Sequence, residues 1–272
     1  MSDAVAAERV PPFNPSHLPV ALRELTAGCR WQRVTVGASG AEVFLLARTG
    51  AAPWYLKITG RAPGVDTTAE ARRLEWLRGR LTVPRVVALA DEPSASYLLM
   101  TALPGVDATH PTQLAEPERL VRLLAQGLRR LHALPAEDCP FDHRLDAEIA
   151  RAEARLRHRQ VDETDFDQQR QGQRAADLFQ TLRLTRPRAE DLVFTHGDYC
   201  LPNIMIDAGQ VAGFLDLGRA GVGDRYRDLA LAARSITYNL GALWQPLFFQ
   251  AYGIDTPDPA KVEFFQLLDE FF

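Results

Sequence analysis

The segment 193–216 places three oxygen-bearing side chains at fixed spacing around a tight turn. An apolar run leads into a His-Gly turn that ends at Asp198, and Asn203 follows five residues later. A second apolar run comes next, and Asp216 ends a third. This spacing is typical of sites that transfer phosphoryl groups, where one aspartate meets the acceptor hydroxyl and the other two residues hold a hard cation. The segment therefore predicts Asp198 as proton acceptor, with Asn203 and Asp216 as metal ligands.

The chain before this segment predicts strands around one helix. Alternating or apolar runs favour strands, and leucine and alanine at helical spacing favour a helix over 67–81. The five expected strands are 31–36, 42–47, 53–58, 83–90 and 96–101.

Lys57 lies inside an apolar strand, and Glu70 lies in the first turn of the expected helix. A buried Lys57–Glu70 pair would direct the ammonium towards phosphate oxygens. Alternatively, Lys57 is an edge residue with a solvated head group and Glu70 complements the helix dipole. The turn that contains Ser39 has the layout of a loop folded over phosphates, but any tight hairpin has the same layout.

After a Pro-Gly break at residues 102–105 the pattern becomes helical. Helices are expected at 116–134, 145–157 and 175–184, from 224 onwards, and in two further stretches near the end of the chain. Asp228 is an acid in an apolar run, and we interpret it as an acceptor for backbone donors of the catalytic turn. The predicted organisation is α+β, with an N-terminal lobe (1–101), a hinge (102–105) and a mostly helical C-terminal lobe (106–272).

Composition limits the classes of function. A formal charge of −4 without a basic block argues against nucleic acid as a partner. Three widely spaced cysteines predict neither a disulfide framework nor a zinc site, and they favour a reducing compartment. The first residues lack the pattern of a signal peptide, and no run of about 18 apolar residues predicts a membrane span. We therefore expect a cytoplasmic protein.

The sequence resembles the aminoglycoside 3'-phosphotransferases, the kanamycin and neomycin resistance kinases. The most specific similarity is in residues 195–204 (THGDYCLPNI), 213–219 (GFLDLGR), 221–226 (GVGDRY) and 267–272 (LLDEFF). The His-Gly-Asp core is shared with choline, fructosamine and homoserine kinases, whereas CLPNI and the LLDEFF ending are closer to the 3' group. The resemblance implies a bilobal protein-kinase-like fold with a five-stranded antiparallel sheet and one helix in the N-terminal lobe. It also implies phosphorylation of a drug 3'-hydroxyl, and hence antibiotic resistance.

The resemblance also implies residue roles. Asp198 matches the catalytic aspartate, and Asn203 and Asp216 match the Mg²⁺ ligands. His196 matches a structural turn residue. The nucleotide is ATP, with GTP left open, and the residues implied on its side are Lys57, Glu70, Ser39, Met100, Ala102 and Leu103. The substrate residues implied are Asp165, Asp167, Arg219, Asp269, Glu270 and the Phe272 carboxylate. Acids suit a substrate that carries several ammonium groups, although the acids around residue 165 also fit a solvated loop.

Three positions depart from the family pattern. Ser235 and Tyr238 stand where some relatives carry acids, and Gln168 stands where an acid is common, so the range of accepted drugs stays open. A kinase for another amino-sugar or amino-alcohol is the alternative enzyme, and a catalytically silent nucleotide-binding scaffold is the alternative from another class. The expected assembly is a monomer or a weak dimer.

Overall fold

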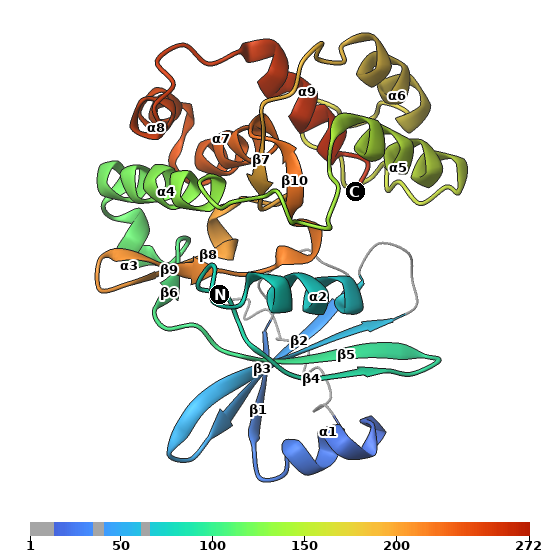
Figure 1. The fold of residues 1–272 in the computed structure, drawn as a ribbon, viewed down its shortest axis with the longest axis vertical. Coiled ribbons are helices and arrows are strands. Elements are labelled where there is room, and N and C mark those ends of the chain that lie inside the picture. The colour runs from blue at the N-terminus through green and yellow to red at the C-terminus, as the bar shows by residue number, and fades with distance from the viewer. Residues whose placement is uncertain (1–13, 35–40, 61–65) are drawn as a thin grey trace, which may run out of the picture.

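The computed structural model describes residues 14–34, 41–60 and 66–272. The N-terminal part contains an antiparallel sheet with strand order β1-β2-β3-β5-β4 (Figure 1). Its strands are β1 (Arg30–Val34), β2 (Ala41–Arg48), β3 (Ala51–Gly60), β4 (Val86–Asp91) and β5 (Ala95–Thr101). The predicted five strands are therefore confirmed, with ends shifted by a few residues. Ser39 lies outside the described residues.

The two faces of this sheet bury different groups because successive side chains of a strand point to opposite faces. Leu56 and Ile58 belong to a small core against α1 (Val20–Leu25). Lys57, between them, faces α2 (Thr67–Leu77), where it meets Glu70. Figure 1 shows α1 and α2 on opposite sides of the sheet. The alternation of β3 thus turns Lys57 towards the rest of the molecule.

Helix α2 begins at a strong cap and ends earlier than predicted. The Asp66 side chain accepts hydrogen bonds from the backbone N–H groups of Thr68 and Ala69, which otherwise lack partners in the first turn. The helix stops at Leu77, and Gly79 follows with a φ of 79°. A glycine at positive φ is a common way to end a helix, so the prediction that α2 reaches residue 81 was wrong.

The C-terminal part is mostly helical, as predicted (Figure 1). Its helices are α3 (Pro111–Leu114), α4 (Pro117–His132), α5 (Leu145–Arg157), α6 (Ala175–Leu184), α7 (Tyr226–Leu240), α8 (Gln245–Tyr252) and α9 (Pro259–Asp269). Two small antiparallel sheets, β6-β8-β9 and β7-β10, accompany them. Their strands are β6 (Val106–Asp107), β7 (Leu192–Thr195), β8 (Ile204–Asp207), β9 (Gln210–Phe214) and β10 (Gly221–Asp224). The predictions missed α3, β6 and β10, which are too short to show periodicity.

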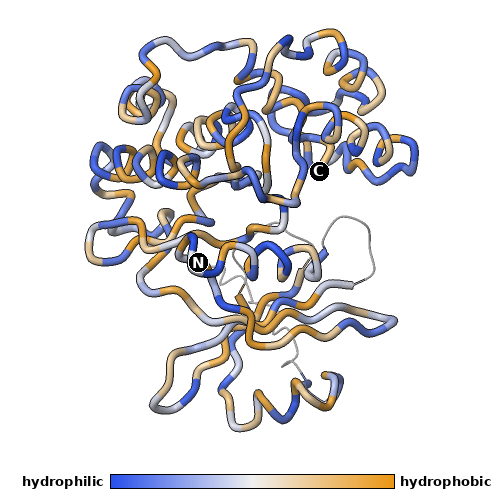
Figure 2. The backbone as a smooth tube through the Cα atoms, viewed as in Figure 1, coloured by the Kyte–Doolittle hydropathy of each residue, from blue (hydrophilic) through white to orange (hydrophobic). Residues whose placement is uncertain are grey.

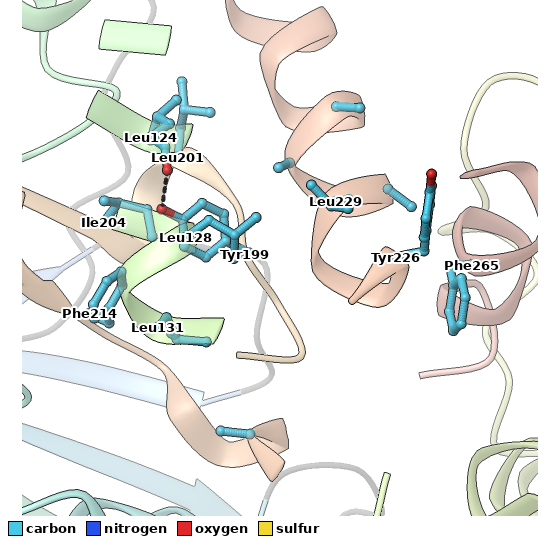
Figure 3. Close-up of a cluster of buried hydrophobic side chains, with 14 of the residues drawn as sticks. Leu124, Leu128, Leu131, Tyr199, Leu201, Ile204, Phe214, Tyr226, Leu229 and Phe265 are labelled. Atoms are coloured by element: carbon cyan, nitrogen blue, oxygen red, sulfur yellow. Dashed lines mark hydrogen bonds between the residues drawn. The ribbon is translucent and has the colours of Figure 1, made fainter. Parts of the chain in front are cut away.

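One large hydrophobic core joins α2 to the helical part. Polar and apolar residues alternate along most elements, as expected when each element has one buried face (Figure 2). Tyr199, which follows the catalytic turn, is fully buried among residues of α4, β8 and β9 (Figure 3). Its hydroxyl donates to the backbone oxygen of Leu124 at 2.8 Å. This bond satisfies a polar group in an apolar environment and anchors the segment after the turn.

Gly105 lies where the chain passes from the large sheet to the helical part. Its φ is +88°, and a Cβ atom there would lie 2.1 Å from the backbone oxygen of Ile206. Only glycine fits so close an approach at this backbone conformation. None of the helices in the described ranges combines the length and apolar character that crossing a bilayer requires.

Candidate active site

The catalytic turn joins β7 to a short 3-10 helix (Leu201–Asn203) and is held by Asp228, in the first turn of α7. The two carboxylate oxygens of Asp228 accept hydrogen bonds from the backbone N–H groups of His196 and Gly197 at 2.7 and 2.8 Å. Burial acts to raise the pKa of Asp228, but the hydrogen bond from His132 and nearby cationic groups hold it below its usual value. The predicted structural role of Asp228 is confirmed by these contacts.

Two features of the turn fix the backbone ahead of Asp198. His196 is fully buried, burial lowers its pKa, and its Nδ1 atom accepts a hydrogen bond from the backbone N–H of Asp198 at 3.2 Å. Gly197 has a φ of +86°, and a Cβ atom there would lie 2.2 Å from the backbone oxygen of Arg219. His196 therefore acts as a turn residue, and Gly197 allows the turn to pack against the segment that follows Asp216.

Asn203 is oriented by Asp198. Its Nδ2 atom donates to Oδ2 of Asp198 at 2.8 Å and to the backbone oxygen of Asp198 at 3.0 Å. These bonds fix the orientation of the Asn203 amide group and leave its oxygen as the atom available to a cation. The backbone oxygen of Asn203 also accepts from the N–H of Leu215 at 2.8 Å, next to Asp216. The antiparallel pairing of β8 and β9 thus brings the two predicted metal ligands to one place.

Lys57 links the sheet and α2 to Asp216. Its Nζ atom lies 2.9 Å from Glu70 Oε2 and 2.8 Å from Asp216 Oδ1, and the lysine side chain is 6% exposed. Burial acts to lower the lysine pKa, but the two carboxylates outweigh it and raise that pKa. Lys57 therefore stays charged. Of the two interpretations of Glu70, the structure supports the buried ion pair.

The residues predicted beside the nucleotide base lie at the end of β5. Met100, in β5, pairs with Tyr55 of β3 on one side and with Val86 of β4 on the other. The N–H of Ala102 donates to the backbone oxygen of Pro53 at 3.1 Å, so it already has a partner. Leu103 lies against Gly213 of β9, because a Cβ atom placed on that glycine would lie 2.7 Å from the Leu103 Cδ1 atom.

The predicted substrate acids lie close to one another but carry arginine partners. Asp269 accepts from Arg219 at 2.8 Å and forms a second ion pair with Arg234. Phe272, the last residue, has its ring 4.9 Å from the Arg219 guanidinium. Since Arg219 is three residues from Asp216, Asp269 lies beside the segment that carries the predicted metal ligand Asp216.

A buried arginine that the sequence analysis missed joins the acidic segment to the C-terminus. Arg170 is 4% exposed and forms ion pairs with Asp167, Glu263 and Glu270. The N–H of Asp167 also donates to Glu270 at 3.1 Å. Burial, followed by the nearby Asp167, raises the pKa of Glu270 to about 7. Asp165 is exposed, whereas the other predicted substrate acids, Asp167, Asp269 and Glu270, are partly buried.

These contacts define a kinase-like site. It combines the turn that ends at Asp198, an amide and a carboxylate that flank the paired strands β8 and β9, and a buried lysine held by a helix glutamate. The chain also matches the model of the phosphotransferase enzyme family over residues 30–265.

Individual relatives are more specific. An aminoglycoside 3'-phosphotransferase of Streptomyces fradiae is 41% identical over 255 residues, covering 89% of this chain and 95% of the relative. A crystal structure of an aminoglycoside 3'-phosphotransferase of type VIII superposes with a TM-score of 0.83 at 36% identity, covering 93% and 97% of the two chains. A Streptomyces rimosus aminoglycoside phosphotransferase in complex with ADP and streptomycin gives a TM-score of 0.77 at 28% identity, covering 92% and 95%. The chain therefore belongs to the aminoglycoside 3'-phosphotransferase family, and its protein-kinase-like fold is confirmed.

Proposed function

We propose that this chain transfers the γ-phosphoryl group of ATP to the 3'-hydroxyl of an aminoglycoside and thereby confers resistance. One observation carries the proposal: Asn203 is bonded to Asp198, Lys57 is paired with Asp216, and a backbone hydrogen bond from Leu215 to Asn203 brings these two pairs together. The names of the relatives supply the acceptor class. We place the nucleotide between the lobes 1–101 and 106–272, with residues 102–105 on its edge.

The donor side of the reaction depends on Lys57. Its ammonium group stays protonated between Glu70 and Asp216, so it offers a fixed positive charge to phosphate oxygens. Because Glu70 and Asp216 restrict the side chain to one direction, little conformational freedom is lost when a phosphate binds. Met100, Ala102 and Leu103 would line the adenine edge.

The metal ligands have suitable chemistry for Mg²⁺. The amide oxygen of Asn203, just before β8, and the second carboxylate oxygen of Asp216, just after β9, are both hard oxygen donors beside paired strands. Mg²⁺ commonly takes one or two protein oxygens and completes its shell with phosphates and water. When bound, the ion would neutralise charge on the β- and γ-phosphates.

Asp198 would hold and deprotonate the acceptor. The 3'-oxygen attacks the γ-phosphorus, the bond from that phosphorus to the β-γ bridging oxygen breaks, and the hydroxyl proton passes to a carboxylate oxygen of Asp198. The bond from Asn203 restricts the direction of that carboxylate. Positioning of the hydroxyl in line with the leaving oxygen supplies much of the rate.

Most of the residues proposed to bind the aminoglycoside are acidic, and arginine side chains of the protein neutralise part of their charge. Asp269 is shared by Arg219 and Arg234, whereas Asp165 is exposed. Ammonium groups of the substrate would therefore find their most accessible carboxylate at Asp165, and further contacts at Asp167, Glu270 and Phe272. A polycation is a better match for this surface than an amino-alcohol with one charge.

The test is phosphate transfer from ATP to a panel of aminoglycosides with and without a 3'-hydroxyl. We expect transfer only to drugs that carry this hydroxyl, and activity on a drug without it would contradict the regiochemistry. Asp198→Ala should abolish transfer while ATP binding, measured by calorimetry, stays within a few fold. Asp255→Ala removes an exposed carboxylate elsewhere on the surface and is the control. Full activity of the Asp198→Ala variant would refute the assignment.

A further inference from the structure

Helix α2 contacts the segment that carries Asp216. Figure 1 shows α2 between the large sheet and the helical part. The Cβ of Glu70 would lie only 3.8 Å from a Cβ placed on Gly218, two residues after Asp216. Glu70 in turn holds Lys57. The position of α2 relative to residues 216–221 therefore determines whether Lys57 can contact Asp216.

Arg73, three residues after Glu70, lies on the same side of α2 and crosses to that segment. Its Nε atom donates to the backbone oxygen of Ala220 at 2.7 Å. Its Nη2 atom lies 3.1 Å from His143 Nε2, and its Nη1 atom donates to the backbone oxygen of Ala69 at 3.0 Å. The guanidinium also stacks over the Phe141 ring at 4.6 Å. Each nitrogen atom of the Arg73 guanidinium group thus has an acceptor in this one side-chain conformation.

His143 is suited to accept from Arg73 because it is neutral. Burial, followed by the charge of Arg227, lowers the pKa of His143 to about 4. Its Nδ1 atom lies 2.7 Å from the buried carboxylate of Glu148, which fixes the ring proton on Nδ1. The lone pair of Nε2 then faces the arginine. A protonated imidazole could not accept this bond.

A second arginine holds the same segment from the other side. Arg227, in α7, donates to the backbone oxygen of Arg219 at 2.9 Å and to Thr195 Oγ1 at 3.1 Å. Consecutive carbonyl groups at residues 219 and 220 are thus bound by arginines from α7 and α2. Asp216 itself adopts a φ of 54°, a conformation that costs about 1 kcal/mol or more for a residue other than glycine. Contacts from its surroundings must stabilise it.

We propose that Arg73 is a positioning residue for phosphoryl transfer: it docks α2 on residues 216–221 and so keeps Lys57 aligned with Asp216. Arg73 acts through Lys57 and Glu70 and does not touch the nucleotide. The inference rests on the proposed ATP-dependent transfer for its kinetic consequences, but the docking of α2 can be tested without activity.

The kinetic test compares Arg73→Met, Arg73→Lys and Arg72→Met, the last being an exposed arginine next to it on α2. Displacing catalytic groups by about 1 Å can cost about 100-fold in rate. For Arg73→Met we expect kcat/KM for ATP to fall by about 10- to 100-fold, while KM for the aminoglycoside changes less than about twofold. Arg73→Lys, which keeps one donor, should recover part of the loss. Arg72→Met should behave as the unsubstituted chain.

The second measurement is amide hydrogen exchange. Arg73→Met should accelerate exchange in residues 67–77 while leaving α4 and α7 protected, and Arg72→Met should not. Unchanged exchange in α2 together with unchanged kinetics would overturn the inference. Equal increases in KM for both substrates, together with faster amide exchange throughout the chain, would also overturn it, because that result indicates a general loss of stability. If the unsubstituted chain transfers no phosphate, the proposed function fails, and the exchange result alone decides the role of Arg73.

Discussion

The buried pair of Lys57 and Glu70 allows stability to be separated from activity. In Lys57→Met, Glu70 loses a partner at 2.9 Å, and its side chain is only 3% exposed. Burial already raises the pKa of Glu70. Without the lysine, the least costly state at neutral pH is the protonated acid, since an unpaired buried carboxylate is much worse.

The magnitude follows from this proton uptake. Neutralising a glutamate at pH 7, when its unfolded pKa is about 4.3, costs about 3.7 kcal/mol, and at pH 5 it costs about 1 kcal/mol. A group whose folded pKa is raised destabilises the protein above its unfolded pKa, so the penalty must grow as pH rises. We therefore expect Lys57→Met to lose about 3–4 kcal/mol of unfolding free energy at pH 7. At pH 5 the loss should be about 1 kcal/mol.

Urea denaturation of the unsubstituted chain and the variant at pH 5, 6 and 7 measures this difference. The double variant Lys57→Met/Glu70→Met removes both charges and should recover most of the stability at pH 7, because two apolar groups often replace a buried ion pair at little cost. Both variants should lack phosphoryl transfer. A loss that does not change between pH 5 and 7, or a double variant as unstable as the single one, would refute the reasoning.

Two further predictions concern the turn and the acceptor side. Gly197→Ala should lower kcat for phosphoryl transfer by about 100-fold, because the added Cβ would lie 2.2 Å from the Arg219 backbone oxygen and must displace Asp198. A kcat equal to that of the unsubstituted chain would contradict this packing. Arg170→Met should raise KM for the aminoglycoside about 10-fold and lower stability by about 3 kcal/mol, since Glu270 loses a buried partner. KM for ATP should stay within about twofold, and exposed Arg174→Met is the control. An unchanged KM for the aminoglycoside would exclude this role of Arg170.

Much of the architecture was predictable because it depends on local pattern. Helices 145–157 and 175–184 were predicted with the bounds that the structure gives, since their apolar spacing is regular over ten residues or more. The elements that were missed, such as β6 and β10, have two to four residues and are formed by pairing with distant strands. The end of α2 depended on the backbone of Gly79, which no periodicity shows.

The residues of the candidate site also differ in whether local pattern or packing determines them. Spacing along the chain identified Asp198, Asn203 and Asp216, because β8 and β9 form a local hairpin that brings the last two together. The choice between a solvated and a buried Lys57 could not be made from its strand alone. It was decided by the face of β3 that α2 covers, which is a property of packing.

By itself, the sequence determined the order of chemical groups: a lysine and a glutamate on one side of a Pro-Gly break, and an Asp-x4-Asn, a second aspartate and terminal acids on the other. Only the tertiary structure decided which partner each charged side chain has. Arg73, Arg170 and Arg234 are unremarkable in the sequence, yet they bind Ala220, Glu270 and Asp269 from 35 to 147 residues away. The physical reason is that packing of distant segments determines which groups lie next to each charge, and a buried charge without a partner would cost several kcal/mol.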